Sequence, residues 1–183
     1  SFPTDPDQAI LSYAQSGAPA TAVRVAYGAM PAMPAAPAAL AGATMGTTWS
    51  ARMALPAGRT EAAARHAIQA ALDEVVAQMS TWEADSDITR YNQAAAGWQE
   101  LPAGFFHVLS HALALAGDTG GAYDPTVGPL VNAWGFGPHQ RAFEPPAPAA
   151  IEAARARCGW RRVQLDTDRR AALQPGGAYL DLS

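Results

Sequence analysis

Apolar residues recur with helical spacing in two long segments of the chain. In the first segment they fall at i, i+3, i+4, i+7, i+8 and i+11, at Ile68, Ala71, Leu72, Val75, Val76 and Met79. This spacing predicts an amphipathic helix that Thr60 can cap. The second helix is expected to open at Pro102 and to end at Gly117 and the 120–121 glycine pair. Its apolar face would comprise Phe105, Leu109, Ala112, Leu113 and Ala116.

Shorter patterns predict strands on either side of these helices. Residues 47–55 (TTWSARMAL) alternate in residue type as a half-buried strand does, and residues 56–59 (PAGR) have turn chemistry. The polar connection 80–97 is expected to hold a short helix over 88–92, with Asp85 and Asp87 forming Asx turns or its cap. A third helix over about 148–157 leads to three predicted strands, at 160–166, 170–174 and 178–182. The order strand, helices, strands indicates an α+β fold with mixed α/β layers.

The two ends of the chain differ from its middle. Residues 1–40 are interpreted as an N-terminal extension or linker, because residues 29–42 (AMPAMPAAPAALAG) carry prolines that prevent a helix and show no strand pattern. Residues 41–183 would form the domain. The last strand stops at Asp181 and Ser183 as if a helix should follow, and we therefore expect a fragment of a larger domain.

Composition and motifs narrow the possible functions. The 183 residues are 49% hydrophobic and only 15% charged, with a net charge of −4, so we expect no nucleic-acid partner. Because the chain is poor in basic residues, the phosphate groups of a ligand would have to be bound by backbone amides or by a metal ion. The chain has no P-loop, GxSxG or GxGxxG motif, which disfavours Walker and Rossmann enzymes. His107 and His111 lack the carboxylate of an HExxH motif, Cys158 has no neighbouring metal ligand, and no metal site is predicted.

The segment 120–138 (GGAYDPTVGPLVNAWGFGP) is the strongest candidate for chemistry. Its five glycines and three prolines surround aromatic walls at Tyr123, Trp134 and Phe136, while Asp124 and Asn132 can form directed hydrogen bonds. Prolines stiffen such a loop before binding, and this mixture is typical of a cofactor pocket. A purely structural Ω-loop is the alternative.

Three further places combine polar groups with rigid surroundings. In residues 44–49 (TMGTTW), Gly46 permits close approach of a ligand, or the segment forms a β-bulge. Trp82, at a helix exit, can stack on a planar ring or pack in the core. Asp181 follows a strand at its carboxyl end, where open α/β sheets place ligand groups.

These places, taken in order, resemble the ApbE family, the FAD:protein FMN transferases. The matching segments are 45–50 (MGTTWS), 79–92 (MSTWEADSDITRYN), 120–138 and 179–183 (YLDLS). The resemblance spans about 43–183, is most specific at 120–138, and implies the N-terminal part of an ApbE-like fold. It gives no account of residues 1–40.

The resemblance implies a Mg²⁺-dependent enzyme that transfers FMN from FAD to a Ser or Thr hydroxyl of an acceptor flavoprotein subunit and releases AMP. The FAD contacts it implies are Met45, Trp82, Ala122, Tyr123, Asp124 and Asp181. Many relatives have Tyr where Trp82 stands. Catalytic groups and metal ligands are expected in a second half, which is absent here and could be a separate chain.

Three functions remain open: the flavin transferase, an FAD pyrophosphatase that uses water as acceptor, and a non-catalytic flavin-binding module. The family works mainly outside the bacterial cytoplasm. The resemblance therefore implies a periplasmic protein, either soluble or held at the inner membrane through an N-terminal lipid anchor as a lipoprotein.

Overall fold

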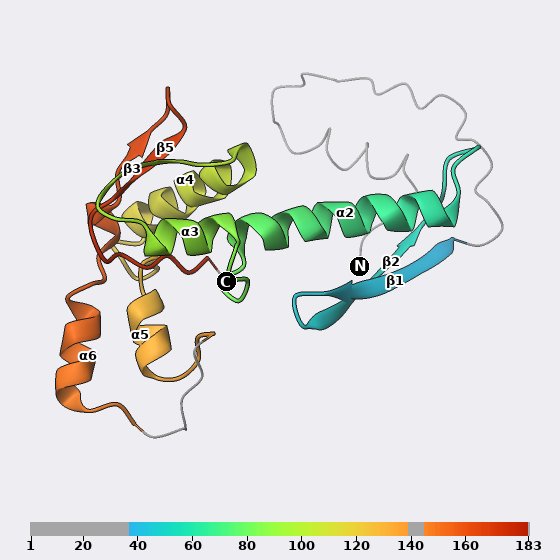
Figure 1. The fold of residues 1–183 in the computed structure, drawn as a ribbon. Helices are drawn as coiled ribbons and strands as arrows, with labels where there is room; N and C mark the ends of the chain where they lie inside the picture. Colours follow the sequence, from blue (N-terminus) through green and yellow to red (C-terminus); the bar gives the residue numbers. More distant parts are fainter. Residues whose placement is uncertain (1–36, 139–144, 183) are drawn as a thin grey trace, which may run out of the picture. The chain divides into compact units, whose positions relative to one another are not determined.

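The computed structural model describes residues 37–138 and 145–182, and expectations for the other residues lie outside it. The chain contains both helices and strands, in runs and not in strict alternation (Figure 1), which confirms the predicted α+β class. In order they are β1 (Ala38–Thr44), β2 (Thr47–Met53), α2 (Glu61–Met79), α3 (Asp87–Gln93), β3 (Gly97–Glu100), α4 (Ala103–Asp118), α5 (Gly128–Ala133), α6 (Pro148–Arg155), the 3₁₀ helix η1 (Trp160–Arg162), β4 (Leu165–Asp166) and β5 (Ala171–Gln174).

Strands β1 and β2 form an antiparallel hairpin. Thr44 pairs with Thr47 across a two-residue turn at Met45 and Gly46, which have φ values of 49° and 69°. Two positive φ angles are what a tight hairpin turn of this hand requires. The strand predicted from residue 47 is confirmed, but the expectation of no strand in residues 29–42 is wrong from position 38. Alanines and glycine give β1 no readable alternation, and its pairing with β2 sets its structure.

Helix α2 confirms the first predicted amphipathic helix. The Thr60 hydroxyl accepts a hydrogen bond from the Ala63 amide at 3.1 Å and caps the helix as expected. Helix α2 contacts β1, α3 and α4, as the course of the helix in Figure 1 shows, while Ala71 and Val75 of the predicted apolar face are exposed. The Gln69 side chain ties the helix to the hairpin, because it bonds to the Trp49 indole at 3.0 Å and to the Ala43 carbonyl at 3.1 Å.

The main hydrophobic core lies where α3 and α4 meet the strands β4 and β5. Strand β5 is the centre of a three-stranded antiparallel sheet in the order β3-β5-β4. Four predicted positions on α4 are buried, namely Phe105, Leu109, Ala112 and Ala116, which confirms the second amphipathic helix. The core cluster consists of Ile88, Tyr91, Leu101, Phe105, Leu109, Val163, Ala172 and Leu180.

Several predicted elements differ in the structure. The short helix at 88–92 is confirmed as α3, but Ser86 caps it instead of Asp85 or Asp87, and its hydroxyl accepts from the Thr89 amide at 3.2 Å. Strand β3 was not expected. In the 160–166 segment only Leu165 and Asp166 form a strand, because η1 occupies its start.

Two segments that bear on the site were also predicted wrongly. Residues 120–138 are not one loop, since they contain the helix α5 with Pro129 in its first turn. Residues 178–182 do not form a strand. Their backbone instead bonds to side chains and to a loop, and Asn92 holds both the amide and the carbonyl of Leu180.

Candidate functional site

The predicted flavin-contacting residues 122–124 follow the end of α4. The Gly121 amide bonds to the Ala116 carbonyl at 2.8 Å, which closes the last turn of the helix. Gly120 and Gly121 have φ values of 63° and 90°, a conformation that favours glycine. The glycine pair therefore turns the chain sharply and places Ala122, Tyr123 and Asp124 directly beyond the helix end.

The structure brings Asp181 to this turn. The Asp181 amide donates to the Pro125 carbonyl at 2.9 Å, across more than 50 positions of sequence. Burial raises the pKa of the half-buried Tyr123 phenol, and the carboxylates of Asp181 and Asp124 raise that pKa further. We call Tyr123, Asp124 and Asp181 the Tyr123 cluster. Its members come from two of the four matching segments, and their contact with FAD stays a prediction.

The stretch before Asp181 is held by side chains from two elements, α3 and β5. Asn92 of α3 donates to the Leu180 carbonyl at 2.9 Å and accepts from the Leu180 amide at 2.7 Å. Gln174, fully buried at the end of β5, donates to the carbonyls of Tyr91 and Ala178 and accepts from the amides of 176 and 178. The side chains of Asn92 and Gln174 thus fix the stretch that leads to Asp181, and neither residue was predicted to have this role. Asn92 ends the matching segment 79–92, whereas nothing in the sequence marks Gln174.

The Asp124 carboxylate is already engaged within the protein. Its Oδ1 accepts from the amide and the hydroxyl of Thr126 at 2.8 and 2.6 Å, and its Oδ2 accepts from the Trp160 amide at 3.3 Å. The contact from the Thr126 amide forms an Asx turn. An ionised carboxylate has about four acceptor positions, so Asp124 can accept about one more donor from a ligand.

Met45 and Trp82 lie on other elements than the Tyr123 cluster. Met45 is 57% exposed in the β1–β2 turn, and Trp82 is 58% exposed between α2 and α3. Core packing, the alternative for Trp82, is therefore wrong. A β-bulge at 44–49 is also wrong, because the pairing of β1 with β2 is regular up to the turn. Both side chains are open to a ligand.

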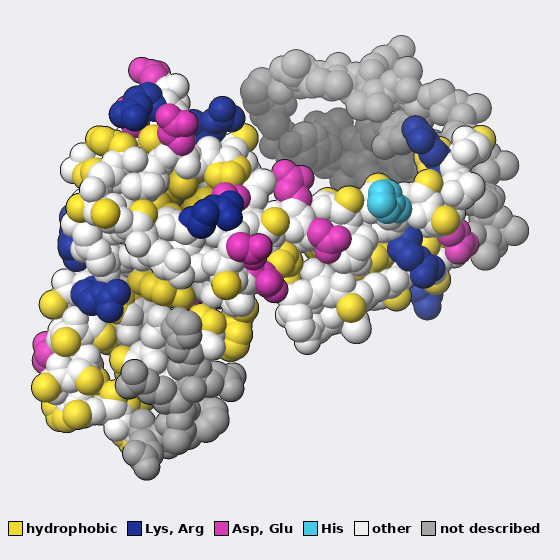
Figure 2. Space-filling view, viewed as in Figure 1, with side chains coloured by type: hydrophobic (Ala, Val, Ile, Leu, Met, Phe, Trp, Pro, Cys, Tyr) yellow, Lys and Arg dark blue, Asp and Glu magenta, His cyan; other side chains and the backbone are white. Residues whose placement is uncertain are grey.

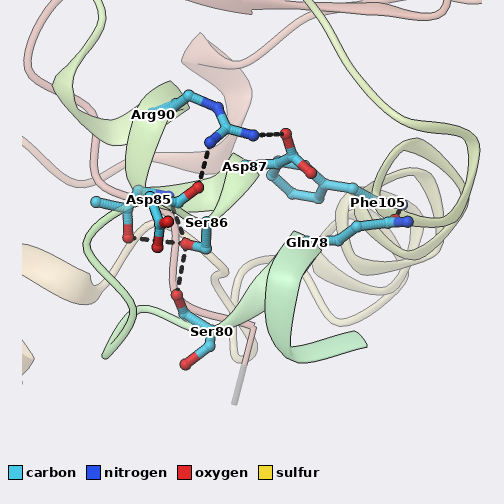
Figure 3. Close-up of polar contacts among 8 residues, drawn as sticks. Gln78, Ser80, Asp85, Ser86, Asp87, Arg90 and Phe105 are labelled. Carbon is cyan, nitrogen blue, oxygen red and sulfur yellow. Dashed lines mark hydrogen bonds and ion pairs between the residues drawn. The ribbon is translucent and has the colours of Figure 1, made fainter. Parts of the chain in front are cut away.

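Polar contacts restrain the backbone between Ser80 and Ser86 (Figure 3), the segment that includes Trp82. The Ser86 hydroxyl donates to the Ser80 carbonyl at 2.6 Å, and the Trp82 amide donates to the Ser80 hydroxyl at 3.3 Å. Arg90 forms an ion pair with Asp87 on the surface of α3. The exposed indole thus projects from a backbone that two serine-centred contacts restrain.

An acidic hollow of about 320 Å³ lies beside this turn. Its lining residues are Asp73, Val76, Ala77, Glu83, Asp85, Ser86, Asp87 and Arg90. Figure 2 shows acidic side chains gathered over this part of α2 and α3, whereas Arg side chains are scattered over the visible face. Four carboxylates against one guanidinium repel a phosphate group. The hollow therefore does not suit the pyrophosphate of FAD, and none of the predicted FAD contacts lines it.

The described residues show neither a cluster of metal ligands nor a membrane-spanning helix. Within residues 37–138 and 145–182, no three His, Cys, Asp or Glu side chains lie close enough to hold a metal ion. His107 and His111 have ring centroids 4.4 Å apart, without a third ligand among these residues. No helix in the same ranges combines the length and apolar content needed to cross a bilayer.

Known proteins match this chain in sequence and in fold. The ApbE family model matches residues 45–183. The FAD:protein FMN transferase of Haemophilus influenzae is 38% identical over 152 residues, which cover 79% of this chain and 44% of that protein. The corresponding protein of Klebsiella pneumoniae is 40% identical over 128 residues, covering 69% and 36%.

The fold agrees with these sequence matches. The flavin transferase ApbE from Vibrio cholerae superposes with a TM-score of 0.77 at 34% identity, covering 81% of this chain and 48% of that one. This chain spans less than half the length of the curated relatives it matches. The resemblance that rested on four short segments is confirmed by a match of 139 consecutive positions, since the family match runs from residue 45 to residue 183. The chain belongs to the ApbE family.

Proposed function

We propose that this chain carries the FAD-binding part of an FAD:protein FMN transferase. The observation that supports the proposal most strongly is the Tyr123 cluster, in which two matching segments meet through the Asp181 to Pro125 hydrogen bond. The relatives that match the chain are named FAD:protein FMN transferase. Because the chain spans less than half of them, the complete reaction, its acceptor and its metal are part of the proposal.

The chemistry of the cluster suits the non-phosphate parts of FAD. Carboxylates accept hydrogen bonds from hydroxyl and amino groups, which FAD offers on its ribityl chain, its ribose and its adenine. Asp124 has room for about one such donor, and Tyr123 adds a half-buried aromatic wall. The exposed Trp82 indole can stack on one of the two ring systems. We therefore assign these residues to binding and orienting the dinucleotide.

In the proposed reaction, a Ser or Thr hydroxyl oxygen of an acceptor redox protein attacks the FMN-side phosphorus of FAD. The phosphoanhydride bond breaks, AMP leaves with the bonding electron pair, and the hydroxyl proton passes to a base. Positioning and charge neutralisation dominate this class of reaction. The described residues contain no set that fits the Mg²⁺ which the resemblance implies, so no step is assigned to it here, and its ligands would have to come from other residues.

The test uses the natural polypeptide that contains this sequence. Incubation with FAD, Mg²⁺ and an acceptor protein should add one FMN moiety to the acceptor in intact-mass measurements. An acceptor with its target Thr replaced by Val should gain no mass. Release of free FMN and AMP without acceptor would instead establish the FAD pyrophosphatase, and tight FAD binding without either product would establish the flavin-binding module.

We also propose that the protein works in the periplasm, as a soluble protein or through a lipid anchor. The basis is the family resemblance alone. Fractionation of cells that produce the natural polypeptide should place it in the periplasmic or membrane fraction, and recovery in the cytoplasmic fraction would contradict the proposal.

A further inference from the structure

A segment outside the four matching motifs, at Gly159 and Trp160, forms hydrogen bonds to the turn at 120–126. Helix α6, which packs against α5, leads to Gly159 and Trp160. The Gly159 amide donates to the Thr126 hydroxyl at 2.7 Å, and the Trp160 amide donates to the Asp124 carboxylate at 3.3 Å. Two successive amides thus bond to the turn that carries the predicted flavin contacts.

Thr126 links these two pieces of chain. Its side chain is fully buried, with 0% exposure. The hydroxyl donates to Asp124 Oδ1 at 2.6 Å and accepts from the Gly159 amide, so its donor and one of its two acceptor positions are used inside the protein. Valine at this position would keep the shape and lose both bonds.

The indole of Trp160 supports the turn from beneath its glycines. A Cβ atom placed on Gly121 would lie 3.2 Å from the indole nitrogen, and one on Gly117 would lie 3.6 Å from the ring. The Arg161 guanidinium lies 4.4 Å from the centre of the same ring, which favours a cation–π contact. The close fit explains why small residues occupy the end of α4 and its turn.

Gly159 makes this arrangement possible. Its φ of 129° is accessible to glycine and strained for other residues. With this backbone the amides of Gly159 and Trp160 reach two different acceptors, the hydroxyl of Thr126 and the carboxylate of Asp124.

We propose that Thr126 and Trp160 are positioning residues for FAD binding. They fix the turn at 120–126 before the ligand arrives, so that Tyr123 and the free acceptor position of Asp124 lose little freedom on binding. A pre-organised site gains affinity by lowering that entropic cost. The inference rests on the proposed function and specifies how its binding site is maintained.

The test compares Thr126→Val with Thr126→Ser in the natural polypeptide. Valine should raise the dissociation constant for FAD about tenfold, the effect of losing hydrogen bonds of ordinary strength. The rate of FMN transfer at saturating FAD should change less than about twofold, because the chemical groups are untouched. Serine restores the hydroxyl and should bind FAD nearly as the wild type does. Ser110→Ala removes a half-buried hydroxyl of α4 that bonds to the Phe106 carbonyl and serves as the matched control.

A second measurement does not require FAD. Amide hydrogen exchange without ligand should be faster at residues 121–124 in Thr126→Val than in the wild type, and unchanged at those residues in Ser110→Ala. Trp160→Leu keeps the backbone bond to Asp124, removes the indole and should accelerate the same amides, so the proposal can still be tested if the valine variant does not fold.

The outcomes separate the inference from the proposed function. If Thr126→Val lowers the melting temperature but leaves both the FAD dissociation constant and the exchange at 121–124 unchanged, Thr126 is only a structural residue and the inference is wrong. If the wild type binds no FAD, the proposed function is wrong, and positioning for FAD is wrong with it. In that case faster exchange in the variants would still show that the two residues hold the turn.

Discussion

Two regions of this protein are packed very differently. Around α3, α4 and the sheet β3-β5-β4, the side chains of Ile88, Phe105, Leu109 and Leu180 are completely buried. Helix α2 spans 19 residues and buries none of them completely, and Leu40 is the one buried side chain of the hairpin it contacts. Stabilisation by apolar burial is therefore concentrated in the first region.

The predicted flavin contacts are divided between these regions. The Tyr123 cluster lies at the end of α4, where buried hydrogen bonds fix it, whereas Met45 lies at the exposed turn of the hairpin. The packed region therefore holds its flavin-contacting side chains in a fixed geometry before the ligand binds. The hairpin can present Met45 to a ligand with little effect on global stability, so stability and flavin binding should respond separately to mutation.

The largest expected effect tests where the stability resides. Leu109→Ala should reduce the free energy of unfolding by about 2–5 kcal/mol, because it leaves a cavity in the core. Leu72→Ala, on the half-buried face of α2, should cost about 1 kcal/mol, in proportion to the smaller area lost from contact. Urea unfolding monitored by circular dichroism measures both, and equal losses would contradict the contrast between the regions.

A smaller effect is expected at the buried amide of Gln174. Alanine there removes the partners of four backbone groups, and unsatisfied buried groups cost about 1–3 kcal/mol each before water or rearrangement compensates. We expect a net loss of about 3 kcal/mol and weaker FAD binding, because the stretch before Asp181 loosens. Gln164→Ala, at an exposed position, is the control and should change neither quantity. A stable variant with wild-type affinity would show that this support is not needed.

Replacement of Trp82 should weaken FAD binding without reducing the stability of the fold. Alanine at this 58% exposed position should change the free energy of unfolding by less than about 0.5 kcal/mol. FAD affinity should fall by about 1–3 kcal/mol if the indole stacks on a ring of the ligand. Isothermal titration and thermal unfolding of the same sample measure the two effects, and wild-type affinity would remove Trp82 from the site.

The smallest effect concerns the packed region at high pH. Burial raises the pKa of Tyr91, whose hydroxyl donates to the Leu173 carbonyl at 2.8 Å. A pKa raised in the folded state leaves stability intact below the unfolded value of about 10 and reduces it as the pH rises above that value. Tyr91→Phe should lose about 1 kcal/mol at pH 8 through the missing hydrogen bond. Its stability should then fall less steeply than that of the wild type between pH 9 and pH 11, and parallel decreases would contradict the assignment.

The sequence predicted the elements that carry a periodic apolar face or a specific cap. Helices α2 and α4 were identified because one face of each is apolar and because Thr60 and Pro102 mark their starts. Strand β1 could not be identified, since its alanines and glycine acquire their conformation from pairing with β2. Strand β3 likewise forms through its pairing with the distant β5. Residues 178–182 form no strand, because distant side chains bond to their backbone.

In the candidate site, too, the residues with a local sequence motif could be predicted and those that act through long-range contacts could not. Short motifs identified Tyr123, Asp124 and Asp181, and the structure brings them together. The residues that hold them, such as Gln174, Thr126 and Trp160, could not be recognised as supports. Their roles depend on hydrogen bonds that span 33 positions at Thr126, 36 at Trp160 and 83 at Gln174. No local sequence pattern indicates such bonds.

The most direct test of the central claim is hydrogen exchange of the natural polypeptide with and without FAD. We predict that FAD slows exchange at residues 120–126 and 179–182 together, because both segments contribute to the Tyr123 cluster, while the buried amides of α4 stay as slow as before. FAD binding that leaves both segments unprotected, or no binding at all, would contradict the claim that these residues form a flavin site.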